Sequence, residues 1–582
     1  MTNLTKKYWL GGVAFAAGLL AIATASAAVP NYATCQPDAI YPGTGSAADN
    51  SDPVCYAVAL EPARDESYQP VGDQRLYDVV PLLSVGDSVP HTEKPGAQYQ
   101  MVGIPDGLGA APISEFGRGR GEDDDDDRDN GHGNDDGVYV FMNHEFTSSV
   151  TSQPELGPGA VPYRGSFVSR WELDEDGNVL EGDRAYDTVF NENVLVGPAD
   201  AAATRPFSRF CSGFLSVDEG LDRPIYFTNE EESNIAATFD GKGGVSVAIF
   251  DDELHTLPKL GHFAKENTVV QPDTGRRTVI ITLEDGPQTP NSQLYMYVGT
   301  KDRGQNASVL RRNGLDNGTL YFFAATGDET TFQAGTISGT WEPVPNAENL
   351  TDAQIEAYVQ ANGSFDFIRL EDGAFNENDN DLFHFVTTGD GTGNRLGRLY
   401  TLKLNSSNPT GSAQLHVEYN GDQVDAAGLD AAFAPDNIDV SGDYLMINED
   451  GTGNSRPEYD PGTPARSRDA SIWRIPLRKG GDWKERVKVD DRVRVAELDD
   501  PGRDGVEVGP GIWETSGIID TSDLFGDDTW LFDVQAHNPT SPPDRATQVE
   551  DGQLLLMFPV DEDDDDDEEE EDEDDDGNEG DD

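Results

Sequence analysis

Short apolar runs of strand character recur along the chain, and five of them end abruptly on carboxylates. Consecutive Val, Ile, Phe and Tyr residues followed by a polar stop are typical of a buried β-strand. A strand that ends in Glu or Asp delivers an acidic group to one rim of its sheet. Several such rims brought together would form a set of hard oxygen ligands. The five runs lie at residues 138–145, 225–232, 279–285, 365–372 and 444–450.

Further β-type runs, separated by Gly, Asp, Asn and Pro turns, continue to about residue 559, and residues 351–360 are the one clear helical candidate. So many short strands predict an all-β fold, and a sandwich of this length would be unusual. A β-propeller of about six blades accommodates the length naturally. The predicted division is a signal peptide (1–27), an irregular N-terminal arm with an acidic loop (28–137), a propeller (138–560) and a disordered acidic tail (561–582).

The net charge changes what this fold can bind. The chain of 582 residues carries 110 acidic against 40 basic residues, a formal charge of -70. Nucleic acids and anionic membranes both require a basic surface, so the charge argues against them and favours divalent cations as partners. The acidic runs at 122–127 and 561–582 are interpreted as solvated segments. The Asp-, Asn- and Gly-rich residues 129–137 could also hold calcium, although their spacing fits no complete EF-hand.

The N-terminus predicts export. Lys6 and Lys7 precede an apolar stretch that ends at a small-residue cleavage site near residue 27, so we expect a secreted or periplasmic protein with no stable membrane span. An uncleaved membrane anchor is the less favoured alternative. Cys35 and Cys55 are expected to form a disulfide in an oxidising compartment, which leaves Cys211 unpaired. Cys211 is interpreted as a buried inert thiol or as a neighbour of the metal ligands.

The carboxylates that end the five runs are candidate metal ligands. Each alone is more often a solvated turn residue, but their repetition at the same place in a blade unit favours convergence on one channel. Clustered carboxylates repel one another unless cations neutralise them, and calcium suits an all-oxygen site. The set is Glu145, Glu230, Glu231, Glu284, Asp285, Glu371, Asp372, Glu449 and Asp450.

The chain resembles the PhoX-type alkaline phosphatases in seven segments that occur in the family's order. The resemblance covers about residues 138–560. The sequence contains no G-x-S-x-G elbow, P-loop, dinucleotide fingerprint or H-E-x-x-H motif, which disfavours serine-hydrolase, nucleotide-dependent and zincin mechanisms. The segments are N-H-E (143–145), F-C-S-G (210–213), T-N-E-E (228–231), G-H-F-A-K-E-N-T-V-V-Q-P-D-T-G (261–275), R-L-E-D (369–372), P-D-N-I (435–438) and L-F-D-V-Q-A-H (531–537).

The resemblance implies a propeller whose channel holds calcium and iron and which hydrolyses phosphate monoesters. Glu266 and Arg369 are the implied catalytic residues, and Arg205, Arg209 and Arg369 could contact phosphate. The implied metal ligands are Glu145, Glu230, Glu231, Glu266, Glu371, Asp372 and Asp436, with Asn143 and Asn437 beside them.

Three positions depart from the family pattern. Asn229 replaces the cysteine of the family's T-C-E-E motif, while Lys265 and His262 replace its histidine and arginine. Asparagine is a poor iron ligand, so calcium is the expected metal and iron is in doubt. Cys211 aligns with a different family cysteine and is not taken as a substitute. A non-catalytic calcium-binding propeller of the envelope or cell surface is therefore the alternative, and a propeller acting on lactones or esters is a third.

Overall fold

The computed structural model describes most of the chain from the second strand onward. The predicted signal segment, Cys35, Cys55, the acidic loop at 122–127 and the acidic tail all lie outside the described residues. No helix within the described part is both long enough and apolar enough to cross a bilayer. The described residues are 57–58, 75–117, 137–199, 205–286, 290–389, 393–450, 456–457, 467–468, 470–498, 513–537 and 545–560.

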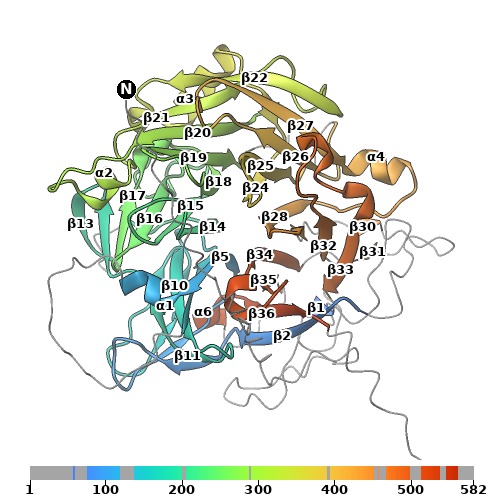
Figure 1. The fold of residues 1–582 in the computed structure, drawn as a ribbon. Coiled ribbons are helices and arrows are strands. Elements are labelled where there is room, and N and C mark those ends of the chain that lie inside the picture. Colours follow the sequence, from blue (N-terminus) through green and yellow to red (C-terminus); the bar gives the residue numbers. More distant parts are fainter. Residues whose placement is uncertain are drawn as a thin grey trace, which may run out of the picture.

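Six blades of the described part are arranged around a common axis (Figure 1), which confirms the predicted all-β propeller. Five sheets build these blades, because β22 of blade 3 pairs with β27 of blade 4 and joins the two blades in one ten-stranded sheet. One innermost strand from each blade lines the central channel, and each packs against the next until the last meets the first. The innermost strands are β5 (Pro105–Pro112), β14 (Phe210–Ser216), β18 (Lys265–Val270), β24 (Leu370–Asn376), β28 (Pro435–Val440) and β34 (Glu514–Asp520).

The other strands of each blade follow outward in antiparallel order. Blade 1 adds β6 (Val138–His144), β10 (Phe167–Leu173) and β11 (Val179–Arg184). Blade 2 adds β15 (Ile225–Glu230), β16 (Ser246–Phe250), β17 (Glu253–Thr256), β12 (Thr188–Asn191) and β13 (Val194–Pro198), with β12 parallel to β17. Blade 3 adds β19 (Arg277–Glu284), β20 (Ser292–Thr300), β21 (Thr319–Ala324) and β22 (Gly335–Val344). Blade 4 adds β25 (Asp379–Thr387), β26 (Arg398–Lys403) and β27 (Ser412–Asn420).

Blades 5 and 6 are completed by N-terminal strands. Blade 5 adds β29 (Tyr444–Glu449), β32 (Ser471–Pro476), β33 (Val493–Leu498) and the short β1 (Ala57–Val58). Blade 6 adds β35 (Trp530–Ala536), β36 (Asp551–Pro559) and, outermost, β2 (Tyr77–Ser84). The pairing of β2 with β36 runs from Tyr77 opposite Pro559 to Ser84 opposite Gln553 and closes the ring.

The predicted start of the propeller at residue 138 is therefore wrong. Both β2 and β5 lie within 28–137, the segment predicted to be an irregular arm, and β5 is the innermost strand of blade 1. The sequence of β5, P-D-G-L-G-A-A-P, carries two glycines and two prolines and no β-branched residue. Glycine and proline are depleted in strands, so β5 forms a strand only because it packs between neighbouring blades.

Connections between the blades carry the remaining elements. The predicted helix is confirmed as α3 (Asp352–Ala361), which begins with a capping box between Thr351 and Gln354. The other short helices are α1 (Ile113–Phe116), α2 (Val309–Arg312), α4 (Gly421–Ala426), α5 (Ser522–Phe525) and α6 (Arg545–Gln548). The minor strands are β3 (Ser88–Pro90), β4 (Gln98–Gln100), β7 (Thr151–Ser152), β8 (Glu155–Leu156), β9 (Tyr163–Arg164), β23 (Asp366–Phe367), β30 (Arg456–Pro457) and β31 (Ser467–Arg468).

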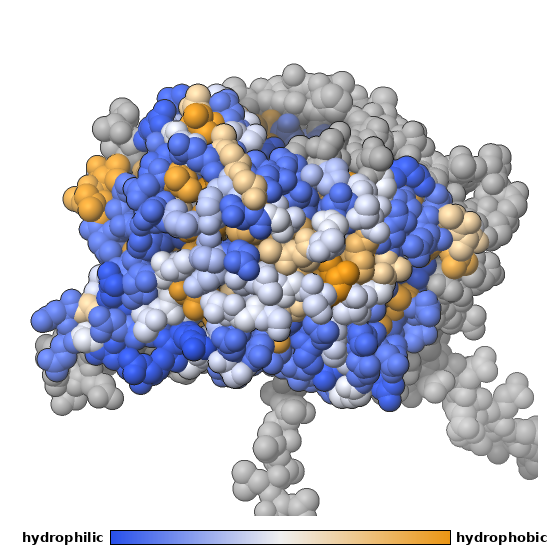
Figure 2. All heavy atoms as spheres, turned by 90° about the horizontal axis from the view of Figure 1, so that it is seen from above, coloured by the Kyte–Doolittle hydropathy of each residue, from blue (hydrophilic) through white to orange (hydrophobic). Residues whose placement is uncertain are grey.

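Apolar cores fill the spaces between adjacent blades. The second strands β6, β15, β19 and β29 are buried on both faces, which is why their runs are almost continuously apolar rather than alternating. The side of the molecule in Figure 2 is mainly hydrophilic, with apolar side chains in small separate patches. The described large apolar side chains that are most exposed are Leu180, Val194, Leu195, Val196 and Ile235.

Every innermost strand contains a β-bulge at the same height. In β14, for example, Phe210 pairs with Glu230 and Gly213 with Thr228, so two residues of β14 face one residue of β15. The same irregularity occurs in the other five innermost strands. A bulge bends its strand and turns its extra residue out of the regular alternation. Six bulges around one axis therefore aim six pairs of residues at the channel.

Four of the bulged strands are entered through a residue with positive φ: Ile104 (52°), Arg209 (49°), Arg369 (55°) and Ala434 (49°). Non-glycine residues rarely adopt this conformation, and for a β-branched residue such as Ile104 it is strained. The backbone carbonyl of each of these residues accepts a hydrogen bond from the backbone N–H of the residue just after the second strand of the same blade. The donors, in the same order, are Glu145, Glu231, Thr388 and Asp450. The turn thus joins the ends of the first two strands beside the channel.

The five carboxylate-ended runs occupy two kinds of position. Only residues 365–372 end on an innermost strand, β24. The other four runs form β6, β15, β19 and β29, which are second strands, so their terminal carboxylates reach the channel from its rim. The sequence pattern did not distinguish these two positions, because a bulge breaks the period-two alternation in the innermost strands.

We expect Gly107→Ala to destabilise the ring by roughly 3 kcal/mol, because overpacking against fixed backbone forces neighbouring strands apart. A Cβ at Gly107 would lie 2.1 Å from the Gly213 nitrogen and 2.6 Å from the Cys211 carbonyl oxygen. Urea unfolding of metal-free protein measures the change. Gly117→Ala is the control, since a Cβ there meets no described atom within 4 Å. Equal stability of the two variants would contradict the close packing of β5 on β14.

Candidate metal centre

The six bulges build two rings of residues around the channel. The first ring consists of the first bulge residues: Asp106, Cys211, Glu266, Glu371, Asp436 and Ser516. The second ring consists of the residues that follow them: Gly107, Ser212, Asn267, Asp372, Asn437 and Gly517. Side chains far apart in the sequence thereby meet on one axis.

Members of the first ring form three groups, two of them together with a rim carboxylate, and the candidate ligand atoms of each group lie within 4.8 Å of one another. The groups are Asp106, Glu145 and Cys211; Cys211, Glu231 and Glu266; and Glu266, Glu371 and Asp436. Cys211 belongs to the first two groups and Glu266 to the last two. The three groups therefore form one continuous chain, which we call the central cluster.

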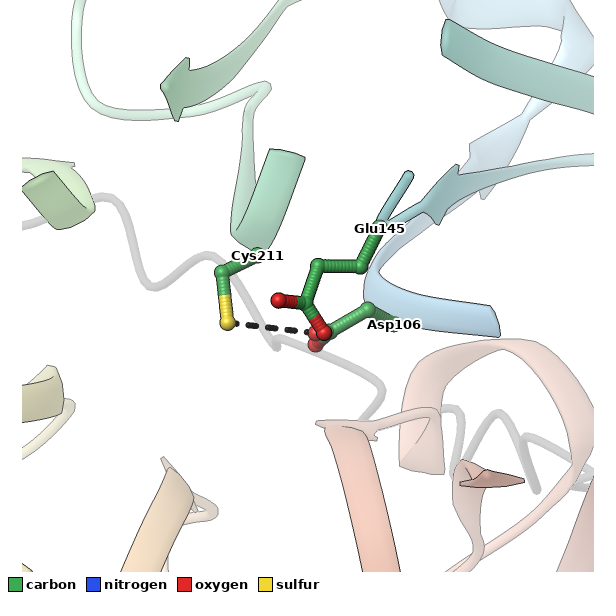
Figure 3. A group of neighbouring side chains, drawn as sticks. All are labelled: Asp106, Glu145 and Cys211. Atoms are coloured by element: carbon green, nitrogen blue, oxygen red, sulfur yellow. Dashed lines mark hydrogen bonds between the residues drawn. The ribbon is translucent and has the colours of Figure 1, made fainter. Parts of the chain in front are cut away.

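Figure 3 shows the first group. The Cys211 thiol and the Glu145 carboxylate point toward Asp106 from two neighbouring blades, and the thiol lies 3.2 Å from Asp106 Oδ2. Gln535 of blade 6 donates to Asp106 Oδ2 at 3.1 Å and to Glu145 Oε2 at 3.3 Å. One amide thus orients both carboxylates.

The clustered, buried carboxylates of the central cluster favour the binding of a cation. Burial, followed by the neighbouring carboxylates, raises the pKa of Asp106, Glu266 and Asp436 well above the usual range. Burial and then Asp285 raise the pKa of Glu371 to about 8. A buried carboxylate is stable in its ionised form only with a positive partner, and a metal ion supplies several charges at once.

Unpartnered oxygens point to the same conclusion. Asn437 Oδ1 and Gln535 Oε1 are buried without a hydrogen-bond donor in the described part of the chain. Glu371 Oε1 lies 3.2 Å from Arg369 Nη2, but that approach lacks hydrogen-bond geometry. Buried polar atoms are almost always satisfied, so such oxygens fit metal coordination. The residues present therefore suit metal ions.

The donor set separates two kinds of position. Glu266, Glu371 and Asp436 offer oxygen only, which suits a hard cation such as calcium. The two groups that share Cys211 add a soft thiol, which as a thiolate favours a transition metal. The structure places Cys211 within the site, so the exclusion of this cysteine from the expected ligands is corrected.

Five of the seven predicted ligands meet in the central cluster: Glu145, Glu231, Glu266, Glu371 and Asp436. Glu230 lies outside the three groups because successive residues of a strand point to opposite faces. Its carboxylate accepts hydrogen bonds from the Phe239 N–H at 2.9 Å and the Ser208 N–H at 3.1 Å. Asp372 belongs to the second ring and accepts from Asn267 Nδ2 and the Gly373 N–H, both at 2.5 Å.

Asp106 and Cys211 are candidate ligands that the sequence did not predict. Asp106 follows Pro105 as Asp436 follows Pro435, so the repeated Pro-Asp pair was an available signal. Cys211 precedes a Ser-Gly pair at the equivalent place in its blade. Both residues lie in bulges, which a strand pattern does not reveal.

Asn229 has a packing role that the sequence did not predict. It lies opposite the bulge of its own blade, and its amide donates at 3.3 Å to the carbonyl of Glu266, in the bulge of the next blade. Asn143 and Asn448 occupy the same place in blades 1 and 5 and donate to the Cys211 and Ser516 carbonyls. Asn229 is therefore one of three clamps between blades and not a vacant metal-ligand position.

Asp533 occupies the clamp position of blade 6, where an ionised carboxylate has no N–H to donate. It is fully buried, and neither oxygen has a hydrogen-bond partner of good geometry among the described residues. Burial, followed by Asp106, raises the pKa of Asp533 well above its usual value, and the Gly517 amide offsets this only in part. The clamp between blades 6 and 1 is thus weaker than the other three.

We expect Asp533→Asn to raise the free energy of unfolding at pH 7 by roughly 1 to 2 kcal/mol, because an amide supplies the missing donor. Since the pKa of Asp533 is raised on folding, its proton stabilises the native protein at low pH. That contribution is lost as pH rises above the ordinary aspartate pKa of 3.8 toward the raised pKa of the folded protein.

The advantage of Asp533→Asn should therefore shrink toward pH 4, which denaturant unfolding of metal-free protein can follow. The reciprocal variant Asn448→Asp should lose stability, because Asn448 donates to the Ser516 carbonyl at 2.5 Å. If Asp533→Asn leaves the free energy of unfolding unchanged or lowers it, the weak clamp between blades 6 and 1 is contradicted.

Two arginines lie at the rim above the carboxylates. Arg369 pairs with Asp285 at 3.1 Å, with Glu371 at 3.2 Å and with Asp450 at 3.7 Å, and its side chain keeps 21% exposure. Arg209 pairs with Glu231 at 2.5 Å and keeps 37% exposure. Both guanidiniums therefore adjoin ligands of the central cluster and remain open to solvent. Arg205 lies apart, beside Gly241 of blade 2.

Comparisons with known proteins agree with this architecture. A family model described as alkaline phosphatase PhoX matches residues 252–465. The chain is similar to the structure of Pseudomonas fluorescens PhoX in complex with vanadate, a transition state analogue, at 14% identity and a TM-score of 0.55. That match covers 87% of this chain and 97% of the other.

A second solved structure resembles the chain much less. The match to the NanB sialidase of Streptococcus pneumoniae has 10% identity and a TM-score of 0.29, and it covers 81% of this chain and 70% of the other. So low a score carries no structural argument. No curated protein matches the chain.

Proposed function

Because the chain belongs to the PhoX alkaline phosphatase family, we propose that it is an exported, metal-dependent phosphatase that hydrolyses phosphate monoesters. The observation that carries the proposal is the central cluster with two exposed guanidiniums at its rim. Anionic ligands bind where positive groups converge, and guanidinium grips phosphate oxygens in pairs. A phosphate ester therefore suits this rim better than a neutral lactone or ester does.

Each residue has a distinct part in the proposed reaction. The residues of the central cluster would hold metal ions, and ions bound there would neutralise phosphate charge, polarise the P–O bonds and activate an oxygen nucleophile. Arg209 and Arg369 orient the phosphoryl oxygens toward the cluster. Asp285 and Asp450 hold the Arg369 guanidinium in place. Glu266, shared by two groups, fixes the spacing of the positions on either side of it.

The ions follow from the donor sets. We assign calcium to the all-oxygen group of Glu266, Glu371 and Asp436, and iron to the positions that Cys211 adjoins. The doubt about iron rested on Asn229, whose side chain hydrogen-bonds Glu266 and Thr268. One motive for the non-catalytic alternative is thereby removed. The N-terminal signal pattern supports export to the periplasm or the medium.

Glu266→Gln tests the activity directly. We expect kcat/KM for p-nitrophenyl phosphate at alkaline pH to fall at least about 100-fold, because the shared ligand loses its charge. Glu175→Gln in an exposed turn of blade 1 is the matched control and should keep full activity. If the unaltered protein does not hydrolyse the ester in the presence of calcium, with or without iron, the proposed phosphatase activity is excluded.

Cys211→Ser tests the metal assignment. Elemental analysis of the purified variant should show the loss of iron and the retention of calcium, because only the soft ligand is removed. The unaltered protein measured in parallel should contain both metals. Calcium alone in the unaltered protein, or equal iron in both proteins, would refute the assignment.

A further inference from the structure

The channel continues past the second ring into a separate cavity of about 350 Å³, which we call the distal cavity. All six innermost strands line it through the residues that follow their bulges, such as Leu108, Val269, Ile438 and Ile518. Asn267 and Asp372 of the second ring lie at its inner end. The distal cavity is therefore on the opposite side of the second ring from the two rim arginines.

The charges of the distal cavity are of one sign. Its lining includes Asp218, Glu219, Glu377, Asp439, Asp520 and Asp523, which we call the acidic mouth. No lysine, arginine or histidine occurs among the described lining residues. Asp218, Glu377 and Asp523 are exposed, so the mouth opens to solvent. Low-dielectric apolar walls behind such a mouth focus its field and concentrate cations.

An unsatisfied oxygen of the second ring lies beside the central cluster. Asn437 is 1% exposed, its amide donates to Ser212 Oγ at 2.8 Å, and its Oδ1 accepts nothing from the described residues. It also contacts Asp372, whose neighbour in the chain is the ligand Glu371. Ser212 in turn donates to Glu266. The second ring therefore offers oxygen ligands between the distal cavity and the central cluster.

The two ends of the channel thus differ in their basic residues, which stand among carboxylates at the rim and are absent from the described lining of the distal cavity. Guanidiniums stand at one rim and carboxylates line the other mouth. An anionic ester would be repelled from the acidic mouth, and a divalent cation would be attracted to it. We propose that the distal cavity is the entry route for the divalent cations of the central cluster, with the second ring as a transient site on the way. This inference rests on the proposed metal-dependent function.

Removal of charge from the mouth tests the route. The triple variant Asp218→Asn/Glu377→Gln/Asp523→Asn changes only exposed residues outside the central cluster. Protein stripped of metal is mixed rapidly with terbium, a luminescent stand-in for calcium, and the uptake rate is followed. We expect uptake at least about 10-fold slower than in the unaltered protein, because steering of this kind changes on-rates by 10-fold or more. Equilibrium affinity and the activity of the calcium-loaded enzyme should not change.

The control removes the same charge elsewhere. The triple variant Glu175→Gln/Asp176→Asn/Glu342→Gln alters exposed positions on blades 1 and 3 and should load at the normal rate. Added sodium chloride should slow the unaltered protein and the control far more than the mouth variant. Equal uptake rates in all three proteins would overturn the route and leave the phosphatase proposal intact. Failure of the unaltered protein to take up metal would overturn both.

Discussion

The rest of the structure depends on the confinement of several carboxylates in one water-poor channel. Coulomb repulsion between buried like charges is many times larger than in water, so the protein needs both a rigid frame and a positive counterpart. The bulged strands supply the frame, since they are buried and packed against neighbours on both sides. Cations would supply the counterpart, and Cys211 and Glu266 link the three candidate ligand groups into one chain.

The frame repeats one local device around the ring. A left-handed residue leads into the strand, a bulge presents two side chains, and the amide of an opposing asparagine reaches the bulge of the next blade. Blades 1, 2 and 5 carry the asparagine, while blades 3 and 4 place Leu283 and Val386 there. Apolar packing therefore replaces the polar clamp in two blades. The carboxylate of Asp533 makes the closing contact the exception.

Much of this arrangement could be predicted from the sequence. The fold class, the single long helix and five of the seven ligands followed from strand-like runs and the resemblance to a family. Strands β2 and β5 could not be found, because Pro81 is tolerated only on an edge strand and the glycines of β5 serve close packing. Cys211 and Asp106 were missed because a bulge breaks the alternation that reveals which face a residue occupies. Glu230 lies outside the three groups because successive residues of β15 point to opposite faces, and Asp372 because it is the second residue of its bulge.

The pairing of β2 with β36 has a consequence for the order of events as the chain is made. Val79 finds its partner Met557 only when nearly the whole chain has been synthesised. Until then the ring stays open, and the ligands of blades 1 and 5 cannot share one channel. The six blades therefore complete the candidate metal centre only once β36 has been made and β2 has paired with it.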